Sequence, residues 1–196
     1  MAKIKSSKNG TKKEAIVEAA AQLFHAKGFS ATSMRDLAET LGVEAASLYN
    51  HIQSKSELLQ EICFKVANEF TANIETINSQ VQTATARIEA LLRFHIRQMV
   101  YNHQEVYVAD REWKHLAEPY LSNFQNQRRV YRQRIAGIIE EGIKNKEIKH
   151  IDAPTAVLII LHAVSGIESW HRSKKKISAE LLEKNMVTIL VEGLKK

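Results

Sequence analysis

Some side chains in the N-terminal third of the chain have the chemistry that DNA recognition requires. Thr32 and Ser33 precede an expected helix, where hydroxyls and free backbone N–H groups suit a phosphate oxygen. Asn50 can pair with an adenine edge and Glu44 can accept from cytosine. Ser33 as a simple helix cap and Glu44 as a complement to the helix dipole are the alternative roles. The candidate base-reading residues are Arg35, Glu44, Ala45, Ala46 and Asn50.

Other chemistries fit the sequence poorly. Glu112-x-x-His115 has the spacing of half a di-metal carboxylate site, but a second such pair is absent, so we expect no metal and no cofactor. The sequence has no Gly-rich phosphate loop, CxxC pair, HExxH motif or nucleophile elbow, which predicts that the protein is not an enzyme. Cys63 is the only cysteine, which excludes an intrachain disulfide and predicts a small core residue.

The elements that would position these residues are two short helices between Ser33 and His51. Gly42 lies where the chain must reverse, since glycine adopts a positive φ at little cost. Such a pair forms a helix-turn-helix, whose second helix lies in the DNA major groove. The apolar face of the pair comprises Met34, Leu37, Ala38, Leu41, Val43 and Leu48.

The flanking residues strengthen this interpretation. Ser54 and Glu57 form a predicted capping box before an apolar run that begins at Leu58. The whole segment from about Lys12 to Leu59 resembles the DNA-binding domain of the TetR family of bacterial repressors. The matching residues are Ala20–Phe24, Lys27–Phe29, Thr32–Ala38, Leu41–Val43, Ser47–Tyr49, His51 and Ser54–Leu58.

The resemblance implies which residues contact the DNA backbone. In the alternative interpretation the Tyr49 ring packs on the first helix and Lys55 is a solvated lysine. The implied phosphate contacts are Thr32, Ser33, Ser47, Tyr49, His51 and Lys55.

The rest of the chain predicts an all-α protein of about nine helices. We expect a basic flexible tail over residues 1–11, a three-helix DNA-binding domain over 12–53 and a larger helical effector-binding and dimerisation domain over 54–196. The tail is either a solvated segment or a basic arm attracted to phosphates, and both can hold. The expected helices run over about Lys12–Lys27, Ser33–Leu41, Glu44–Ile52, Ser54–Ser79, Thr83–His103, Gln104–Leu116, Pro119–Lys146, Asp152–His171 and Ser178–Leu194.

The second half also resembles the family. Tyr131, Ile139–Gly142, Trp170 and Glu192–Leu194 are similar to the branch that responds to acyl-CoA thioesters. That branch commonly has glycine where Lys146 stands, so Asn145 is expected to take the left-handed conformation instead.

Family members bind small molecules inside the helical bundle, and aromatic, soft and histidine side chains are the candidates here. The alternative for each aromatic is a place in the core, and for each histidine a structural hydrogen bond. The candidate ligand-binding residues are Phe94, His95, Met99, His103, Tyr107, Trp113, Phe124, Tyr131 and His162.

The last two expected helices have more apolar surface than one bundle can cover. Because a symmetric pair of helix-turn-helix units reads two half-sites, dimerisation also fits the DNA mechanism. The candidate interface residues are Leu158, Leu161, Val164, Ile189 and Leu190.

Charge and hydropathy fit a cytoplasmic protein with an anionic partner. The formal net charge is +6, and the N-terminus has no apolar signal region. The most apolar window, Ala156 to Val164, is too short to span a bilayer and predicts a helix buried on all sides.

The sequence therefore predicts a homodimeric transcriptional repressor that binds an operator in double-stranded DNA and is released by a small-molecule effector, with an acyl-CoA or another hydrophobic ligand as the candidate. The alternative is a DNA-binding regulator without a small-molecule gate, controlled by a protein partner or by its abundance.

Overall fold

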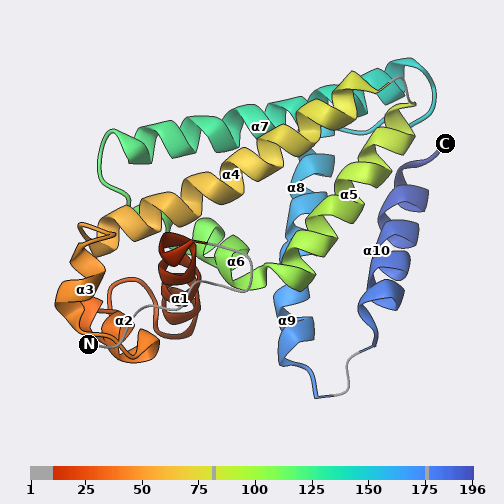
Figure 1. Ribbon diagram of the computed structural model, residues 1–196. Coiled ribbons are helices and arrows are strands. Elements are labelled where there is room, and N and C mark those ends of the chain that lie inside the picture. Colours follow the sequence, from red (N-terminus) through yellow and green to blue (C-terminus); the bar gives the residue numbers. More distant parts are fainter. Residues whose placement is uncertain (1–10, 81–82, 175–176) are drawn as a thin grey trace. The chain divides into compact units, whose positions relative to one another are not determined.

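The computed structural model of the 196-residue chain describes residues 11–80, 83–174 and 177–196. Most of the predicted basic tail lies outside the described residues. The described part is built from helices, with one isolated antiparallel bridge between Ile148 and Lys195 (Figure 1). The helices are α1 (Lys12–Lys27), α2 (Met34–Leu41), α3 (Ala45–Tyr49), α4 (Lys55–Ser79), α5 (Ala84–Tyr101), α6 (His103–Arg111), the 3-10 helix η1 (Trp113–His115), α7 (Tyr120–Lys144), α8 (Ala153–Ser165), α9 (Ile167–Arg172) and α10 (Ala179–Leu194).

The described residues group into two compact units. The first contains residues 11–68 together with Gln104–Gln125, and the second contains Glu69–His103 together with Asn126–Lys196. Helices α4 and α7 therefore contribute residues to both units, while η1 and all of α6 except its first residue, His103, belong to the first. This division by compactness differs from the predicted functional boundary at Ser54.

In the first unit, local caps set the helix ends. Thr11 and Glu14 form a capping box at the start of α1, which ends at Gly28 with φ 82°. Gly42 ends α2 in the left-handed conformation with φ 65°, as predicted for the turn. The largest fully buried side chains are apolar residues from α1, α3, α4, the first part of α7 and the turn after α3: Ile16, Phe24, Leu48, Ile52, Leu58, Leu59, Ile62 and Phe124.

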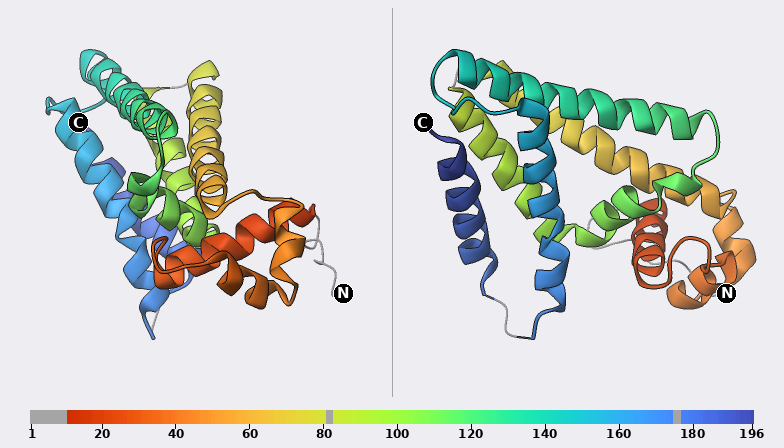
Figure 2. Two further views of the ribbon diagram at one scale, coloured as in Figure 1. Left: turned by 90° about the vertical axis from the view of Figure 1, so that its left-hand side faces the viewer. Right: turned by 180° about the vertical axis from the view of Figure 1, so that it is seen from behind.

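In the second unit, α5 is the central helix. It packs against α10 and also against α8 and α9, and the same neighbours are visible from opposite sides (Figures 1 and 2). Its inner face buries Ile88, Leu91, Leu92 and Ile96. Side-chain caps start three helices, with Thr83 at α5, Asp152 at α8 and Ser178 at α10.

Three predicted helices have different bounds in the structure. The recognition helix, predicted over Glu44–Ile52, is only Ala45–Tyr49, because the His51 N–H bonds the Leu48 carbonyl three residues back, at 2.9 Å, and does not continue the i→i−4 pattern. The segment Gln104–Leu116 divides at Glu112 into α6 and η1. The segment Asp152–His171 divides at Gly166 into α8 and α9, consistent with the low helix propensity of glycine.

The predicted burial of the apolar α8 segment on all sides is wrong. Leu158 and Ile159 are each 57% exposed, while Val157, Ile160 and Val164 on the other face are buried. The helical stretch Ala153–Arg172 is also longer than the predicted apolar window. By length and composition it could cross a membrane, with a mean hydropathy of 1.3, although a core helix of a soluble protein passes the same test.

The turn after α7 corrects another prediction. Lys146, with φ 63°, takes the left-handed conformation that was assigned to Asn145. Inside α7, Gly142 is buried, and a Cβ there would lie 2.6 Å from Cδ1 of Ile148 and 2.9 Å from Cβ of Ala84. Glycine at this position therefore lets α7 approach these two residues closely.

Candidate nucleic-acid interface

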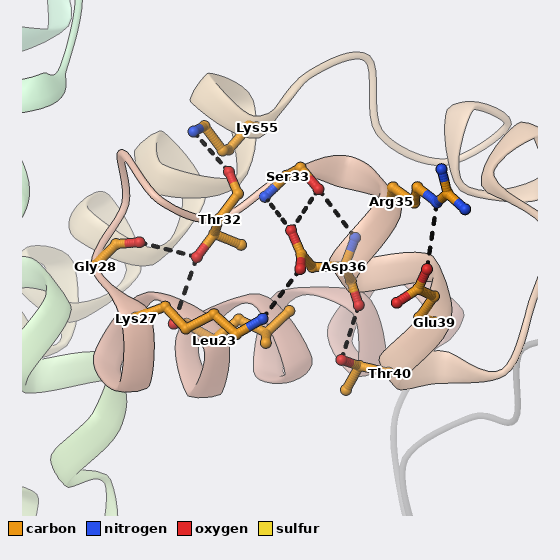
Figure 3. A network of polar contacts seen from close by, with 10 residues as sticks. All are labelled: Leu23, Lys27, Gly28, Thr32, Ser33, Arg35, Asp36, Glu39, Thr40 and Lys55. Carbon is orange, nitrogen blue, oxygen red and sulfur yellow. Dashed lines mark hydrogen bonds and ion pairs between the residues drawn. The ribbon is translucent and has the colours of Figure 1, made fainter.

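At the start of α2, the backbone N–H groups of Ser33 and Asp36 are hydrogen-bonded to side chains of the same turn (Figure 3). The backbone N–H of Ser33 donates to Asp36 Oδ2 at 2.7 Å, the Ser33 hydroxyl also bonds this carboxylate, and Asp36 N–H donates to Ser33 Oγ at 3.1 Å. Lys27 Nζ lies 3.0 Å from Asp36 Oδ1. The hydrogen bonds from Ser33, and then that from Lys27, hold the pKa of Asp36 well below its usual range. The anion site of this helix is thus filled by a carboxylate of the protein.

Thr32 is also engaged within the protein. It is 3% exposed, and its hydroxyl donates to the Gly28 carbonyl at 2.9 Å. Its backbone N–H donates to the Phe29 carbonyl at 3.3 Å. With both donors of Thr32 and both donors of Ser33 used internally, the geometry favours a structural role for these two residues over the predicted phosphate contacts.

Lys55, in the first turn of α4, holds the turn that precedes α2. Its ammonium group donates to the carbonyls of Phe29 at 2.8 Å, Thr32 at 2.7 Å and Ser30 at 3.4 Å. It also lies 4.4 Å from the centroid of the Phe29 ring. Three carbonyls match the three N–H bonds of an ammonium group. The geometry therefore favours a structural role for Lys55 over the predicted phosphate contact.

The recognition helix, in contrast, presents unpaired polar groups. Tyr49 is 54% exposed, His51 is exposed and Ser47 is half-buried. None of these three side chains makes a hydrogen bond or ion pair with another described residue. Three of the predicted phosphate contacts are therefore free to donate to a ligand.

The candidate base-reading residues lie around the same short helix and on α2. Glu44, Ala46 and Asn50 are exposed, and Ala45 is half-buried. Glu44 makes no side-chain cap. The Arg35 side chain is 87% exposed, and only its Nε contacts a carboxylate, that of Glu39 at 3.3 Å. These residues can therefore offer one cationic group, one carboxylate, one amide and two methyl groups to a nucleic acid.

Of the predicted ligand-binding residues, three meet in the second unit. His95 Nε2 lies 2.6 Å from the Tyr131 hydroxyl, and the Phe94 and Phe70 rings both approach the His95 ring edge to face. Burial lowers the pKa of His95 to about 3 and raises the pKa of Tyr131, so both groups are neutral near pH 7. Phe70 also belongs to this cluster but is not among the predicted ligand-binding residues, because the spacing of a single helix does not reveal its neighbours on α5 and α7.

The other predicted ligand-binding residues lie elsewhere. In the second unit the His103 ring stacks on His171 at 4.0 Å, and His171 Nε2 bonds the carbonyl of buried Met99 at 2.7 Å. In the first unit Tyr107 packs against His25, and Trp113 lies near Phe124. His162 is exposed on α8, with its Nδ1 2.9 Å from the Leu158 carbonyl.

A groove in the second unit has a volume of 530 Å³. It contains none of the predicted ligand-binding residues. Its lining is mostly apolar, with Trp170 Nε1 donating to the Ile177 carbonyl at 3.0 Å along one edge. The lining residues are Ala163, Gly166, Ile167, Ser169, Trp170, Ser173, Ile177, Leu182 and Met186.

Large apolar side chains are exposed on α8 and α10. Leu158 is 57% exposed and Ile189 is 71% exposed, as expected for interface residues, and Leu161 and Leu190 are half-buried. Val164 is 2% exposed and faces the core of its own chain, so its side chain is not available to a partner. Two exposed residues were missed, Ile159 at 57% and Leu181 at 44%.

The Glu112-x-x-His115 pair has a structural contact instead of a second metal-binding pair. Glu112 Oε2 accepts the Phe29 N–H at 3.1 Å and lies 3.6 Å from His115 Nε2. Among the residues that the structure describes, no group of three or more His, Cys, Asp or Glu side chains could hold a metal ion.

Two family models match this chain. Residues 16–62 match the model described as bacterial regulatory proteins of the tetR family, and residues 81–194 match a tetracyclin repressor-like C-terminal domain.

Individual relatives match over almost the whole length. The chain is 26% identical over 194 residues to the HTH-type transcriptional repressor KstR2 of Rhodococcus jostii (strain RHA1), covering 96% of this chain and 93% of that protein. The structure of the ketosteroid transcriptional regulator KstR2 of Mycobacterium tuberculosis superposes with a TM-score of 0.88 at 21% identity, over 99% of this chain and 100% of that chain. A structure of AibR in complex with isovaleryl coenzyme A and operator DNA gives a TM-score of 0.80 at 23% identity, over 91% and 97% of the two chains.

Proposed function

The chain belongs to the TetR family of DNA-binding transcriptional regulators, and from this premise we propose that it is a cytoplasmic homodimeric repressor whose operator affinity is lowered by a small-molecule effector. The observation that carries the proposal is the surface formed by α3 and the turn after it, where Ser47, Tyr49 and His51 have donors without a partner among the described residues. Caps, glycine turns and the Lys55 contacts hold the adjoining turn and α2.

DNA contact is divided among these residues by chemistry. Ser47, Tyr49 and His51 donate to phosphate oxygens and set the register of the protein on the duplex. Asn50 and Arg35 are the side chains with donors suited to base edges. Thr32, Ser33 and Lys55 support the helix-turn-helix from within and do not contact phosphate.

A second copy of the chain is proposed to cover the exposed apolar side chains of α8 and α10. Leu158, Ile159 and Ile189 each expose more than half of their surface, and a monomer gains nothing from leaving them in water. A two-fold dimer presents two recognition helices to successive major grooves, about 34 Å apart or a multiple of this distance.

The effector is proposed to bind in the second unit at the neutral pair of His95 and Tyr131. A ligand carbonyl or hydroxyl can replace one partner of their hydrogen bond, and Phe70 and Phe94 supply apolar contact area. An acyl-CoA is the first candidate class because the AibR structure contains isovaleryl coenzyme A. A ligand that favours the released state hundredfold supplies about 2.8 kcal/mol, since each tenfold is worth about 1.4 kcal/mol.

One experiment tests the DNA-binding half of the proposal. The wild-type protein selects duplexes from a randomised library, and sedimentation then gives the stoichiometry on the selected duplex. We expect an inverted repeat that binds two chains per site. Selection of no sequence above background would refute the proposal.

A regulator without a small-molecule gate is the second candidate, and a specific observation favours it. The rings of Phe70, Phe94, His95 and Tyr131 contact one another, so this cluster is already packed. Native mass spectrometry of the purified dimer, compared with its denatured mass, separates the two candidates. Bound non-covalent mass that isovaleryl coenzyme A displaces supports the gate, whereas no mass shift at saturating isovaleryl coenzyme A supports the ungated regulator.

A further inference from the structure

Phe29 is held on three sides within the first unit. Its N–H donates to Glu112 Oε2 at 3.1 Å, and its carbonyl accepts from Lys55 Nζ at 2.8 Å. Its ring stacks on the His115 imidazole with 5.2 Å between the centroids. Phe29 itself is 8% exposed, so these contacts lie at least partly away from water.

Phe29 lies in the turn that connects α1 to the N-cap of α2. Phe29 directly follows Gly28, the C-cap of α1, and Thr32 directly precedes Ser33, the N-cap of α2. The Thr32 N–H donates back to the Phe29 carbonyl at 3.3 Å, and Lys55 binds both carbonyls. A displacement of the Phe29 backbone therefore moves the start of α2, and α3 follows through the Gly42 turn.

Glu112 reaches this turn from a distant part of the chain. It lies 83 residues farther along, between α6 and η1, and its side chain is 17% exposed. Its segment, Gln104–Gln125, is joined at one end to α5, which carries His95, and continues at the other end into the part of α7 that carries Tyr131. The segment is thus covalently connected on both sides to the proposed effector site.

We propose that Glu112 is a positioning residue for DNA binding: its carboxylate holds the Phe29 N–H, and through this bond the Gln104–Gln125 segment controls the placement of the helix-turn-helix. The inference rests on the proposed function, because it names the contact through which an effector regulates operator affinity. With Glu112 in place, Phe29 is held at both its N–H and its carbonyl. When the segment withdraws, the Phe29 N–H loses its acceptor and the Phe29 ring loses the His115 stack. Lys55 and Thr32 still hold the turn, but α2 and α3 are positioned less firmly.

The test compares Glu112→Ala with Glu105→Ala and Glu112→Gln. Glu105 lies in the same segment and pairs with Lys65 at 2.7 Å, so its removal raises the net charge by the same amount without touching the turn. In Glu112→Gln the amide oxygen can still accept from Phe29. Two quantities are measured: the affinity for a duplex of about 30 base pairs selected by the wild type, beside a random duplex, and the hydrogen exchange rate of the Phe29 amide.

Glu112→Ala is expected to weaken binding to the selected duplex about tenfold and to accelerate Phe29 exchange, since a hydrogen bond to a charged acceptor is lost. Binding to the random duplex should not weaken, because the loss of a negative charge favours DNA. Glu105→Ala and Glu112→Gln should retain the selected-duplex affinity of the wild type within about threefold.

Equal behaviour of Glu112→Ala and Glu105→Ala in both measurements would overturn the inference, and so would a Glu112→Gln variant as impaired as Glu112→Ala. If Glu112→Ala does not fold, His115→Ala replaces it, because that side chain is 44% exposed and its removal takes away the ring stack. It should then raise Phe29 exchange and weaken selected-duplex binding, and no change would refute the role of the segment. A wild type that selects no duplex refutes the proposed function separately, and Phe29 exchange still decides whether Glu112 holds the turn.

Discussion

The outward face of α3 and the exposed face of α8 and α10 are both left uncovered by the chain, but they differ in chemistry. On α3 and the turn after it are hydroxyl, phenol and imidazole donors without partners among the described residues, those of half-buried Ser47 and of exposed Tyr49 and His51. On α8 and α10 they are aliphatic side chains such as Leu158 and Ile189. Free donors match phosphate oxygens, whereas aliphatic groups match only another apolar surface. Two incomplete surfaces on one chain therefore point to two different partners.

The polar groups inside the two units differ as well. Behind α3, polar groups such as those of Lys55 and Asp36 are engaged by carbonyls and caps, which leaves the α3 donors as the unpaired ones. In the second unit the polar pair of His95 and Tyr131 is buried among aromatic rings and is neutral. Hydrogen bonds from Ser33 and Lys27 lower the pKa of Asp36 and favour its charged form, whereas burial shifts the pKa values of His95 and Tyr131 and favours their neutral forms, so acid should affect the two units differently.

The largest expected effect comes from breaking the apolar surface. Ile189→Asp places a carboxylate in the proposed interface, and the dimer dissociation constant should rise at least about hundredfold, or about 3 kcal/mol. Sedimentation velocity measures it. Tyr101→Asp is the matched control, because Tyr101 is also apolar in part and 67% exposed but lies on α5. A dimer that survives Ile189→Asp with unchanged affinity would place the interface elsewhere.

Acid should lower the stability of the second unit through the titration of His95. The pKa of His95 is lowered from 6.5 to about 3 in the folded state, so the unfolded chain binds the extra proton between these values. Its contribution to stability is therefore full above about pH 6.5 and is lost as the pH falls, by about 2 kcal/mol at pH 5. Urea unfolding of wild type and His95→Gln at pH 7 and pH 5 measures this difference. Tyr131→Phe should retain the pH dependence of the wild type, since burial is the cause of the lowered His95 pKa. The same loss of unfolding free energy between pH 7 and pH 5 in wild type and His95→Gln would contradict the role of His95.

Two substitutions compare a free donor with an engaged one. Tyr49→Phe removes only a hydroxyl and should weaken binding to all duplexes by about 1 kcal/mol without reducing folding stability. Lys55→Met should lower folding stability and DNA affinity together while the slope of affinity against salt stays constant, because no phosphate contact is lost. Titrations at several salt concentrations, with thermal unfolding, measure both. A slope that falls by about one unit in Lys55→Met would restore Lys55 to the phosphate contacts.

The smallest expected effect is on folding stability, from a substitution in the turn after α7 that lies in neither surface. Lys146→Gly removes the cost of a left-handed conformation at a lysine and should stabilise the fold by about 1 kcal/mol. Lys144→Gly, at the last position of α7, should instead destabilise it by up to about 1 kcal/mol. Thermal unfolding compares the two, with DNA affinity and dimerisation expected at wild-type values. Destabilisation by Lys146→Gly would show that the strain is absent in solution.

Much of the fold follows from local sequence. The bounds of α1 agree with the prediction, because Thr11, Glu14 and Gly28 set its ends through neighbouring backbone groups. The all-helical class and the family are confirmed by the structure and by the matching family models. Where the local signal was weak, at Glu112 and Gly166, continuous helices were predicted and shorter ones are present.

The candidate sites were predicted only in part. The pattern around Ser47, Tyr49 and His51 is local, so these residues could be named from the sequence. The sequence could not show that Lys55 is engaged by carbonyls 23 to 26 residues away, or that Phe94, His95 and Tyr131 meet while Tyr107 and Trp113 lie in the other unit.

The sequence by itself thus determined the helical class, the Gly42 turn, the helix-turn-helix and the family, because each depends on residues within a few positions of one another. Only the tertiary structure decided which donors remain free, which apolar side chains stay exposed, and that Glu112 holds Phe29 across 83 residues. The physical reason is that each polar group can make only a limited number of hydrogen bonds and each side chain can be buried only once. A group engaged by a distant part of the chain is no longer available to a partner, and spacing along the sequence does not reveal that engagement.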